Sequence, residues 1–181
     1  MIKVSESIEL KALLLTDSEM IHQVKEQNRA HLAPWHDWAT KKECLQDTQN
    51  FIISTQKEAA EGISLSLGVF YQDQFIGMLG FNKLDATMKQ AEMGYWLAEK
   101  YTQKGIMTTS AKALIKYGID VLEIRRFSID CAVHNIKSQK VAERLGFCYE
   151  AFLPKNEKVG EMYFDHKRYI FEVKQNMTDL M

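Results

Sequence analysis

The clearest chemical signal in the chain is the segment 101–109, Tyr-Thr-Gln-Lys-Gly-Ile-Met-Thr-Thr, which follows an apolar strand and runs into an amphipathic helix. The first main-chain N–H groups of a helix have no partner within it, and the helix dipole adds about half a positive charge at that end. Such a turn can bind a pyrophosphate mostly through main chain. Gly105 allows the backbone to approach the anion closely, and Lys104 adds positive charge.

A second polar segment, Asn135-Ile-Lys-Ser, heads a short helix that ends Ala-Glu-Arg-Leu-Gly-Phe at 142–147. Asn135 occupies the N-cap position, where its side chain can accept a hydrogen bond from the main chain of the first turn. Ser138 lies within that turn and offers a hydroxyl. A glycine turn before a helix is a weak signal alone, because most such turns only start helices. The presence of the second segment favours a phosphate-binding role for the first over an ordinary helix start.

In order and spacing, the two segments resemble motifs A and B of the GNAT acetyltransferases, whose loop Gln/Arg-x-x-Gly-x-Gly/Ala wraps the pyrophosphate of acetyl-CoA. Within that superfamily the chain resembles the RimJ/RimL branch, most closely the RimL type, over nearly its whole length. The supporting strings are Leu10-Lys-Ala-Leu, Gly94-Tyr-Trp-Leu97, Lys104-Gly-Ile-Met107, Ile124-Arg-Arg-Phe127 and Asn135-x-x-Ser138. Thr102 departs from the pattern at the Gln/Arg position, which removes one side-chain contact to phosphate. Met107 departs at the Gly/Ala position, a milder change because the cradle is main chain.

The resemblance implies acetyl-CoA as co-substrate, and no metal. In the family the two central parallel strands splay apart, and the pantetheine arm pairs with the exposed edge of the fourth strand. The implied cofactor-binding residues are Tyr95, Trp96 and Leu97 on that strand, Gln103, Lys104, Gly105, Ile106, Met107 and Thr108 in the turn, and Asn135 and Ser138. The strand would bind through its main chain, whereas core packing equally explains its aromatic side chains.

An amine that attacks a thioester needs a deprotonated nitrogen, stabilisation of the tetrahedral oxyanion and a proton for the departing thiolate. No covalent enzyme intermediate is required. By resemblance, Ser138 donates to the CoA sulfur as the thiolate forms, and the main chain of the fourth strand offers an N–H to the oxyanion. Asn135 would hydrogen-bond the pantetheine arm, although helix capping alone also explains an asparagine there.

The candidates for the general base are Glu157, Glu92, Glu150 and His134. An N-terminal α-amine has a pKa of about 7.7–8.0, so a weak carboxylate base suffices at neutral pH. Glu157 lies in the predicted loop between the last two strands. It matches the RimL-type base when the alignment is anchored on Asp165, although the nearby glycine is displaced by one position. A solvated loop charge is the alternative reading of Glu157, and Glu92 is the alternative base.

The segment His31-Leu-Ala-Pro-Trp-His-Asp-Trp38 puts aromatic side chains into the connection between the first two predicted helices. The family places this connection over the acceptor groove, so Trp35, His36 and Trp38 are the predicted acceptor-binding residues. The alternative is a loop that inserts Trp35 or Trp38 into the core. No third ligand of suitable spacing accompanies the histidines, so a metal site is not predicted.

The composition limits the class of protein. With 46% hydrophobic residues among 181, the chain can bury one substantial core, and we expect a single domain over residues 1–181. A balance of 23 basic and 24 acidic residues argues against nucleic acid as a direct partner. The three cysteines lack Cys-x-x-Cys spacing and predict buried, reduced thiols. Without a signal-peptide core or an apolar run that spans a bilayer, no membrane association and a cytoplasmic location are expected.

Periodicity places these segments on a mixed α/β chain. Strands are predicted at 8–15, 63–71, 75–84, 90–97, 126–133, 148–153 and 163–173, and helices at 16–28, 40–61, 107–122 and 136–145. Thr40 and Glu43 form a capping box for the second helix. The resemblance adds the GNAT arrangement: an α/β (α+β) fold whose mixed, mostly antiparallel central sheet is splayed between strands 4 and 5 and flanked by four helices. It also implies a homodimer or larger homo-oligomer.

The predicted function is transfer of an acetyl group from acetyl-CoA to a primary amine, foremost the N-terminal α-amine of a protein. A ribosomal protein is the family's characteristic substrate. Two alternatives stay open. In the first, the acceptor is a polyamine, an amino acid or an amine-bearing antibiotic. In the second, the chain is a non-catalytic CoA-binding module, and the Thr102 departure reflects lost catalysis.

Overall fold

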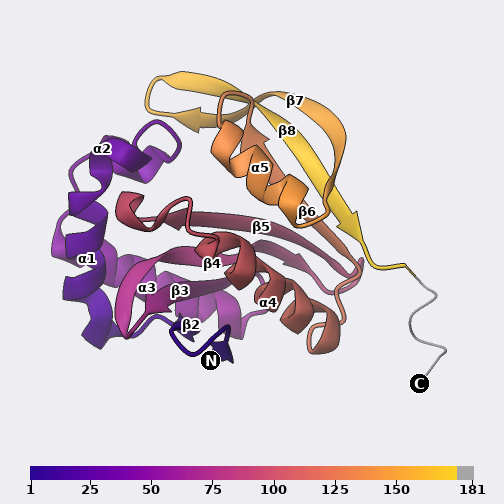
Figure 1. The fold of residues 1–181 in the computed structure, drawn as a ribbon. Helices are drawn as coiled ribbons and strands as arrows, with labels where there is room; N and C mark the ends of the chain where they lie inside the picture. Colours follow the sequence, from indigo (N-terminus) through magenta and orange to yellow (C-terminus); the bar gives the residue numbers. More distant parts are fainter. Residues whose placement is uncertain (175–181) are drawn as a thin grey trace.

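An eight-stranded sheet forms the centre of the protein, whose computed structural model describes residues 1–174 (Figure 1). The strands are β1 (Ile2–Lys3), β2 (Ile8–Ala12), β3 (Leu65–Tyr71), β4 (Gln74–Asp85), β5 (Gln90–Leu97), β6 (Arg126–Ala132), β7 (Cys148–Val159) and β8 (Met162–Glu172). Their spatial order is β1-β2-β3-β4-β5-β6-β8-β7. Only β5 and β6 run parallel, and all other neighbours are antiparallel. The predicted mixed, mostly antiparallel sheet is confirmed.

Helices cover both faces of this sheet (Figure 1). They are α1 (Ser18–Gln27), α2 (Arg29–Leu32), α3 (Leu45–Ala60), α4 (Ile106–Asp120) and α5 (Ile136–Arg144). α4 and α5 pack on one face, and α1 and α3 pack together on the other. The four longer helices are the four that the sequence predicts, and α2 is one additional turn.

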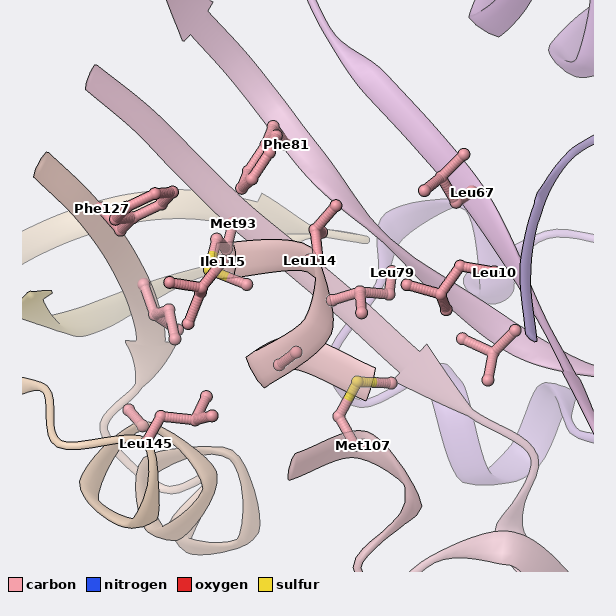
Figure 2. Packing of buried hydrophobic residues seen from close by; sticks show 14 of the residues in the cluster. Leu10, Leu67, Leu79, Phe81, Met93, Met107, Leu114, Ile115, Phe127 and Leu145 are labelled. Carbon is pink, nitrogen blue, oxygen red and sulfur yellow. The ribbon is translucent and has the colours of Figure 1, made fainter. Parts of the chain in front are cut away.

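The core divides into two parts that match the two faces. In the larger part, Leu114 and Ile115 of α4 pack between strand residues such as Phe81, Met93 and Phe127, as Figure 2 shows. In the smaller part, apolar side chains of α1 and α3 pack on β3, β4 and β5. Burying each large apolar side chain contributes about 1.5–3 kcal/mol, so both helix layers are held firmly on the sheet.

The two central strands separate along their length. β5 and β6 pair only over 90–93 and 126–129, and neither pairs with the other beyond Met93 and Ile129. The chain then enters α4 through a turn that ends at Gly105, and enters α5 through the cap at Asn135. The predicted splay is confirmed, because the predicted fourth and fifth strands (90–97 and 126–133) are β5 and β6 once the short β1 is counted. The splay places two helix N-termini beside the gap.

The predicted start of α3 is wrong. The helix begins at Leu45 instead of Thr40, because Thr40 ends a 3-10 helix (Asp37–Thr40), where its hydroxyl donates to the Asp37 carbonyl at 2.7 Å. The box forms one turn later, where the Cys44 N–H donates to Asp47 Oδ2 at 2.8 Å. The residues 40 and 43 therefore do not form the predicted capping box.

The predicted loop around Glu157 is also wrong. β7 continues past Pro154 to Val159, with an irregular register between Leu153 and Glu157, so Glu157 is a strand residue opposite Phe164. The turn between the last two strands contains Gly160 at a φ of 60°.

The three cysteines differ in their burial. Cys131 is buried, but Cys44 and Cys148 are exposed, which corrects the expectation of three buried thiols. Both exposed cysteines stand at element starts, next to α3 and in β7.

No helix within residues 1–174 is long and apolar enough to cross a membrane.

Candidate active site

A cavity of about 850 Å³ opens where β5 and β6 separate. Because β5 and β6 stop pairing at Met93 and Ile129, residues 94–97 pair with β4 on one edge, and their other main-chain edge faces this cavity. Successive side chains of a strand point to opposite faces, so the separated strands line the cavity from both sides of the sheet. One side lies next to α4 and α5, and the other lies next to the connection between α1 and α3.

The turn before α4 presents main-chain donors to the cavity. Within the described part of the chain, the N–H groups of Gln103, Lys104 and Gly105 have no main-chain acceptor, and those of the first helical turn have none inside the helix. Gln103 and Gly105 have φ angles of 62° and 76°, and such left-handed residues make successive N–H groups converge on an anion. A Cβ at Gly105 would meet no atom within 4 Å, so the space over the turn is open. Thr102 also lines the cavity, but its hydroxyl donates to the Glu99 carbonyl at 2.8 Å.

α5 adds positive charge to the same side of the sheet. Lys137, Lys140 and Arg144 line the cavity, and their spacing places them on one helix face. Together with the N-terminus of α4 they fit an anionic group such as the pyrophosphate of a nucleotide cofactor. The sequence analysis missed these three residues, although their helical spacing was visible.

Ser138 is held at the cavity wall. Asn135 caps α5 as predicted, since its Oδ1 accepts from the Ser138 N–H at 3.1 Å. Ser138 Oγ lies 3.0 Å from the Tyr95 hydroxyl and 3.2 Å from Cys131 Sγ. The Tyr95 hydroxyl donates to the Ser138 carbonyl at 3.2 Å, which leaves its oxygen free to accept from the Ser138 hydroxyl.

The neighbours of Ser138 stay protonated at neutral pH. Burial raises the pKa of Tyr95 above its ordinary value, and burial raises the pKa of the Cys131 thiol to about 11. The two side chains that Ser138 Oγ contacts are therefore neutral, and neither opposes the formation of a thiolate beside it.

The other side of the sheet contributes carboxylates to the cavity. Glu92 of β5 and Asp130 of β6 line it. Arg168 donates to both Asp130 oxygens at 2.8 and 2.7 Å, so this carboxylate is already neutralised. Glu92 has Lys83 at 3.5 Å, and because the lysine is 79% exposed the pair is weak. Glu92 therefore remains available as a base.

Glu157 approaches the same side from β7. Its Oε2 lies 3.5 Å from Nε2 of His166, a cavity-lining residue, and 47% of its side chain is exposed. Partial burial raises the pKa of the Glu157 carboxyl, and the negative charges of Glu92, Asp37 and Asp130 raise it further. A carboxylate with a raised pKa is a better base near neutral pH.

The remaining two base candidates lie elsewhere. Glu150 forms an ion pair with Arg126. His134 is exposed in the turn that precedes α5. Of the four candidates only Glu92 lines the cavity, and Glu157 does not line it but lies beside the lining residue His166.

The connection between α1 and α3 forms an aromatic wall. Trp35 and His36 line the cavity, whereas Trp38 does not. Trp38 packs against Trp96, with 5.6 Å between ring centroids, and lies under the Lys25 ammonium at 4.6 Å. Its position fits the core alternative, and the acceptor-binding role predicted for Trp38 finds no support in the geometry.

The wall is neutral and anchored. Burial lowers the pKa of His36 to about 4, with a further contribution from the charge of His31, so His36 is uncharged at neutral pH. Its ring stacks on Trp38 at 5.7 Å. The Gly160 N–H donates to Asp37 Oδ1 at 2.8 Å, which ties the connection to the turn between β7 and β8.

His166 was missed by the sequence analysis. It stands in the run Asp-His-Lys-Arg, which is typical of an exposed strand. In the fold, β8 lies between β6 and β7, and His166 is 5% exposed. No group of three or more His, Cys, Asp and Glu side chains within residues 1–174 is arranged to hold a metal ion.

Comparison with known proteins identifies a matching family. Residues 8–148 match the family model described as an acetyltransferase (GNAT) domain. The chain is 33% identical over 168 residues to the ribosomal-protein-serine acetyltransferase of Escherichia coli (strain K12), which covers 93% of this chain and 94% of that protein.

Solved structures agree with this match. The structure of RimL, the ribosomal L7/L12 α-N-protein acetyltransferase, in complex with coenzyme A superposes with a TM-score of 0.91 at 30% identity, covering 95% of this chain and 97% of that one. The structure of the microcin C7 self-immunity acetyltransferase MccE with acetyl-CoA and AMP superposes with a TM-score of 0.90 at 30% identity, covering 94% and 95%.

Proposed function

This chain belongs to the GNAT acetyltransferase family, and from that premise we propose that it transfers the acetyl group of acetyl-CoA to the N-terminal α-amine of a protein. The observation that carries the proposal is the cavity through the sheet, with unpaired N–H groups and basic side chains on one side and carboxylates on the other. An anionic cofactor and a cationic amine can enter such a cavity from opposite faces.

Acetyl-CoA fits the side next to α4 and α5. Its pyrophosphate would bind the N–H groups of residues 103–108, with Lys137, Lys140 and Arg144 adding charge. The pantetheine arm would lie between the separated strands and pair with the free main chain of 95–97, which leaves an N–H there for the oxyanion. Coenzyme A is bound in the RimL structure, and acetyl-CoA in that of MccE, which supports this assignment.

The reaction would proceed by direct attack within a ternary complex. Glu157 accepts a proton from the ammonium, the resulting amine forms a bond to the thioester carbon, and the second proton that the nitrogen then loses passes to solvent. The carbonyl electrons move to oxygen, where a main-chain N–H of β5 stabilises the oxyanion. As the C–S bond breaks, the thiolate takes the hydroxyl proton of Ser138, and Ser138 regains one from solvent while Glu157 releases its proton.

The relatives support a ribosomal protein as the acceptor. The E. coli relative is named for a ribosomal-protein serine, and RimL for an α-N-protein amine. MccE, which is equally similar in structure, is named for microcin immunity, so small amines must also be tested.

Thiol release from acetyl-CoA tests the proposal with a panel of acceptors. We expect release with N-terminal peptides of ribosomal proteins and much less with spermidine, free amino acids or an N-acetylated peptide that contains lysine. Release with small amines alone would select the small-amine alternative. Coenzyme A binding without release in any mixture would select the binding-module alternative.

Glu157→Gln should separate the two candidate bases. We expect kcat/KM to fall at neutral pH and to recover as the pH rises past the amine pKa of about 7.7–8.0, because a free amine needs no base. Glu92→Gln is the matched control, an isosteric change on the same side of the cavity, and should show no such recovery. The measurement is the pH profile of kcat/KM for the acceptor peptide in both variants.

Other pH responses of the two variants would assign the role of general base to Glu92 or to solvent. A flat response of Glu157→Gln together with recovery in Glu92→Gln would make Glu92 the proton acceptor. A flat response in both variants would mean that solvent takes the proton.

A further inference from the structure

His166 is a buried titratable side chain at the cavity that none of the proposed steps uses. It belongs to β8 and lies opposite Ala132 of β6 and Leu153 of β7. Both of its polar contacts come from the irregular part of β7: Nδ1 lies 3.1 Å from Asn156 Nδ2, and Nε2 lies 3.5 Å from Glu157 Oε2. The imidazole thus connects the cavity wall to the proposed base.

The two contacts define the proton on the ring. The Asn156 amide nitrogen can only donate, so Nδ1 must accept, and the neutral imidazole then carries its proton on Nε2, which faces Glu157. Burial lowers the pKa of His166, and this effect outweighs the opposing influence of Asp130, Glu92 and Asp165. The ring is therefore neutral near pH 7 and offers Glu157 a donor.

Glu157 needs such a partner. Its side chain has three rotatable bonds and is 47% exposed, and it stands where the register of β7 against β8 is broken. The negative charges of Glu92, Asp37 and Asp130 also disfavour its charged form and raise its pKa. A donor fixed in the core is what would hold the carboxylate there.

We propose that His166 is a positioning residue, which holds the Glu157 carboxylate toward the acceptor amine through its Nε2–H while Asn156 fixes the tautomer. This inference rests on the proposed function, with Glu157 as base. It assigns His166 no contact with the substrate and no proton transfer of its own.

Two variants separate positioning from packing. In His166→Gln the amide nitrogen can reach the place of Nε2 and donate to Glu157, whereas in His166→Asn it reaches only the place of Nδ1. We expect kcat/KM for the acceptor to fall about 10–100-fold in His166→Asn and to stay within a few-fold of wild type in His166→Gln. The KM for acetyl-CoA should change in neither. Thermal unfolding gives the folded fraction of both variants.

The pH profile gives a readout that a packing role would not move. A carboxylate that loses a donor is harder to ionise, so the acidic limb of kcat/KM should shift upward by about half to one pH unit in His166→Asn and not in His166→Gln. Equal losses of kcat/KM in both variants, with no shift in the acidic limb of the pH profile, would overturn the proposal.

Nitrogen-15 spectra of the histidine side chains test the premise without turnover. We expect the Nε2–H tautomer for His166 at pH 7 and a changed Nε2 signal in Glu157→Gln. An Nδ1–H tautomer, or a signal indifferent to Glu157→Gln, would overturn the contact. A wild-type protein that acetylates no amine would instead refute the proposed function.

Discussion

Ser138→Ala is expected to lower kcat by about 10²–10⁴-fold while leaving the affinity for acetyl-CoA nearly intact. The hydroxyl is held at the gap between β5 and β6 by Tyr95, whose own hydroxyl stays protonated because burial raises its pKa. Rotation about its C–O bond would turn the proton from Tyr95 to a sulfur placed in the gap. Because the donation matters only as the thiolate forms, its loss should appear in kcat. Steady-state kinetics and calorimetry of CoA binding measure the two effects.

Tyr95→Phe is the control for this experiment. It removes the hydroxyl that holds Ser138 but keeps the Ser138 proton, so we expect a smaller loss of kcat than in Ser138→Ala. A loss confined to KM in Ser138→Ala would make Ser138 a binding residue. Wild-type turnover would mean that water protonates the thiolate.

Gly105→Asp should weaken CoA binding by about 10²–10³-fold, which corresponds to a few kcal/mol. A carboxylate and a Cβ would stand in the open space over the turn, where the pyrophosphate would meet the unpaired N–H groups. Calorimetric titration with CoA measures the loss, and thermal unfolding checks that the variant is folded.

Gly105→Asn isolates the charge. Asparagine has the same shape, and at the φ of 76° it carries a similar backbone strain, but it adds no negative charge. We expect it to bind CoA far better than Gly105→Asp does. Equal affinities in the two variants, or wild-type affinity in the aspartate variant, would remove the phosphate-binding turn from the account.

The parts of the site that depend on local sequence could be predicted. The glycine turn at Gly105 and the cap at Asn135 both follow from residue types within a few positions of a helix start. The start of α3 shows the limit of such rules. Thr40 and Glu43 match the capping pattern, but the 3-10 helix uses Thr40, and the less typical pair Cys44 and Asp47 forms the box.

The parts that depend on packing over long sequence distances could not be predicted. The charged run that contains His166 becomes buried only because β8 inserts between β6 and β7. Glu157 was predicted to be a loop residue because a proline such as Pro154 usually interrupts a strand. In the fold, β7 continues through Pro154 with an irregular register against β8. Trp35 and Trp38 are the same residue type three positions apart, and only the fold decides which one faces the cavity.

The site of acetylation on a two-amine peptide tests the central claim most directly. The peptide carries a free α-amine and one lysine, and tandem mass spectrometry locates the acetyl group after incubation with the protein and acetyl-CoA. The account predicts one acetyl group, on the α-amine. At neutral pH a weak carboxylate base can deprotonate an α-amine, whose pKa is about 7.7–8.0, but not a lysine, whose pKa is about 10.4. Acetylation of the lysine side chain, or of neither amine, would contradict it.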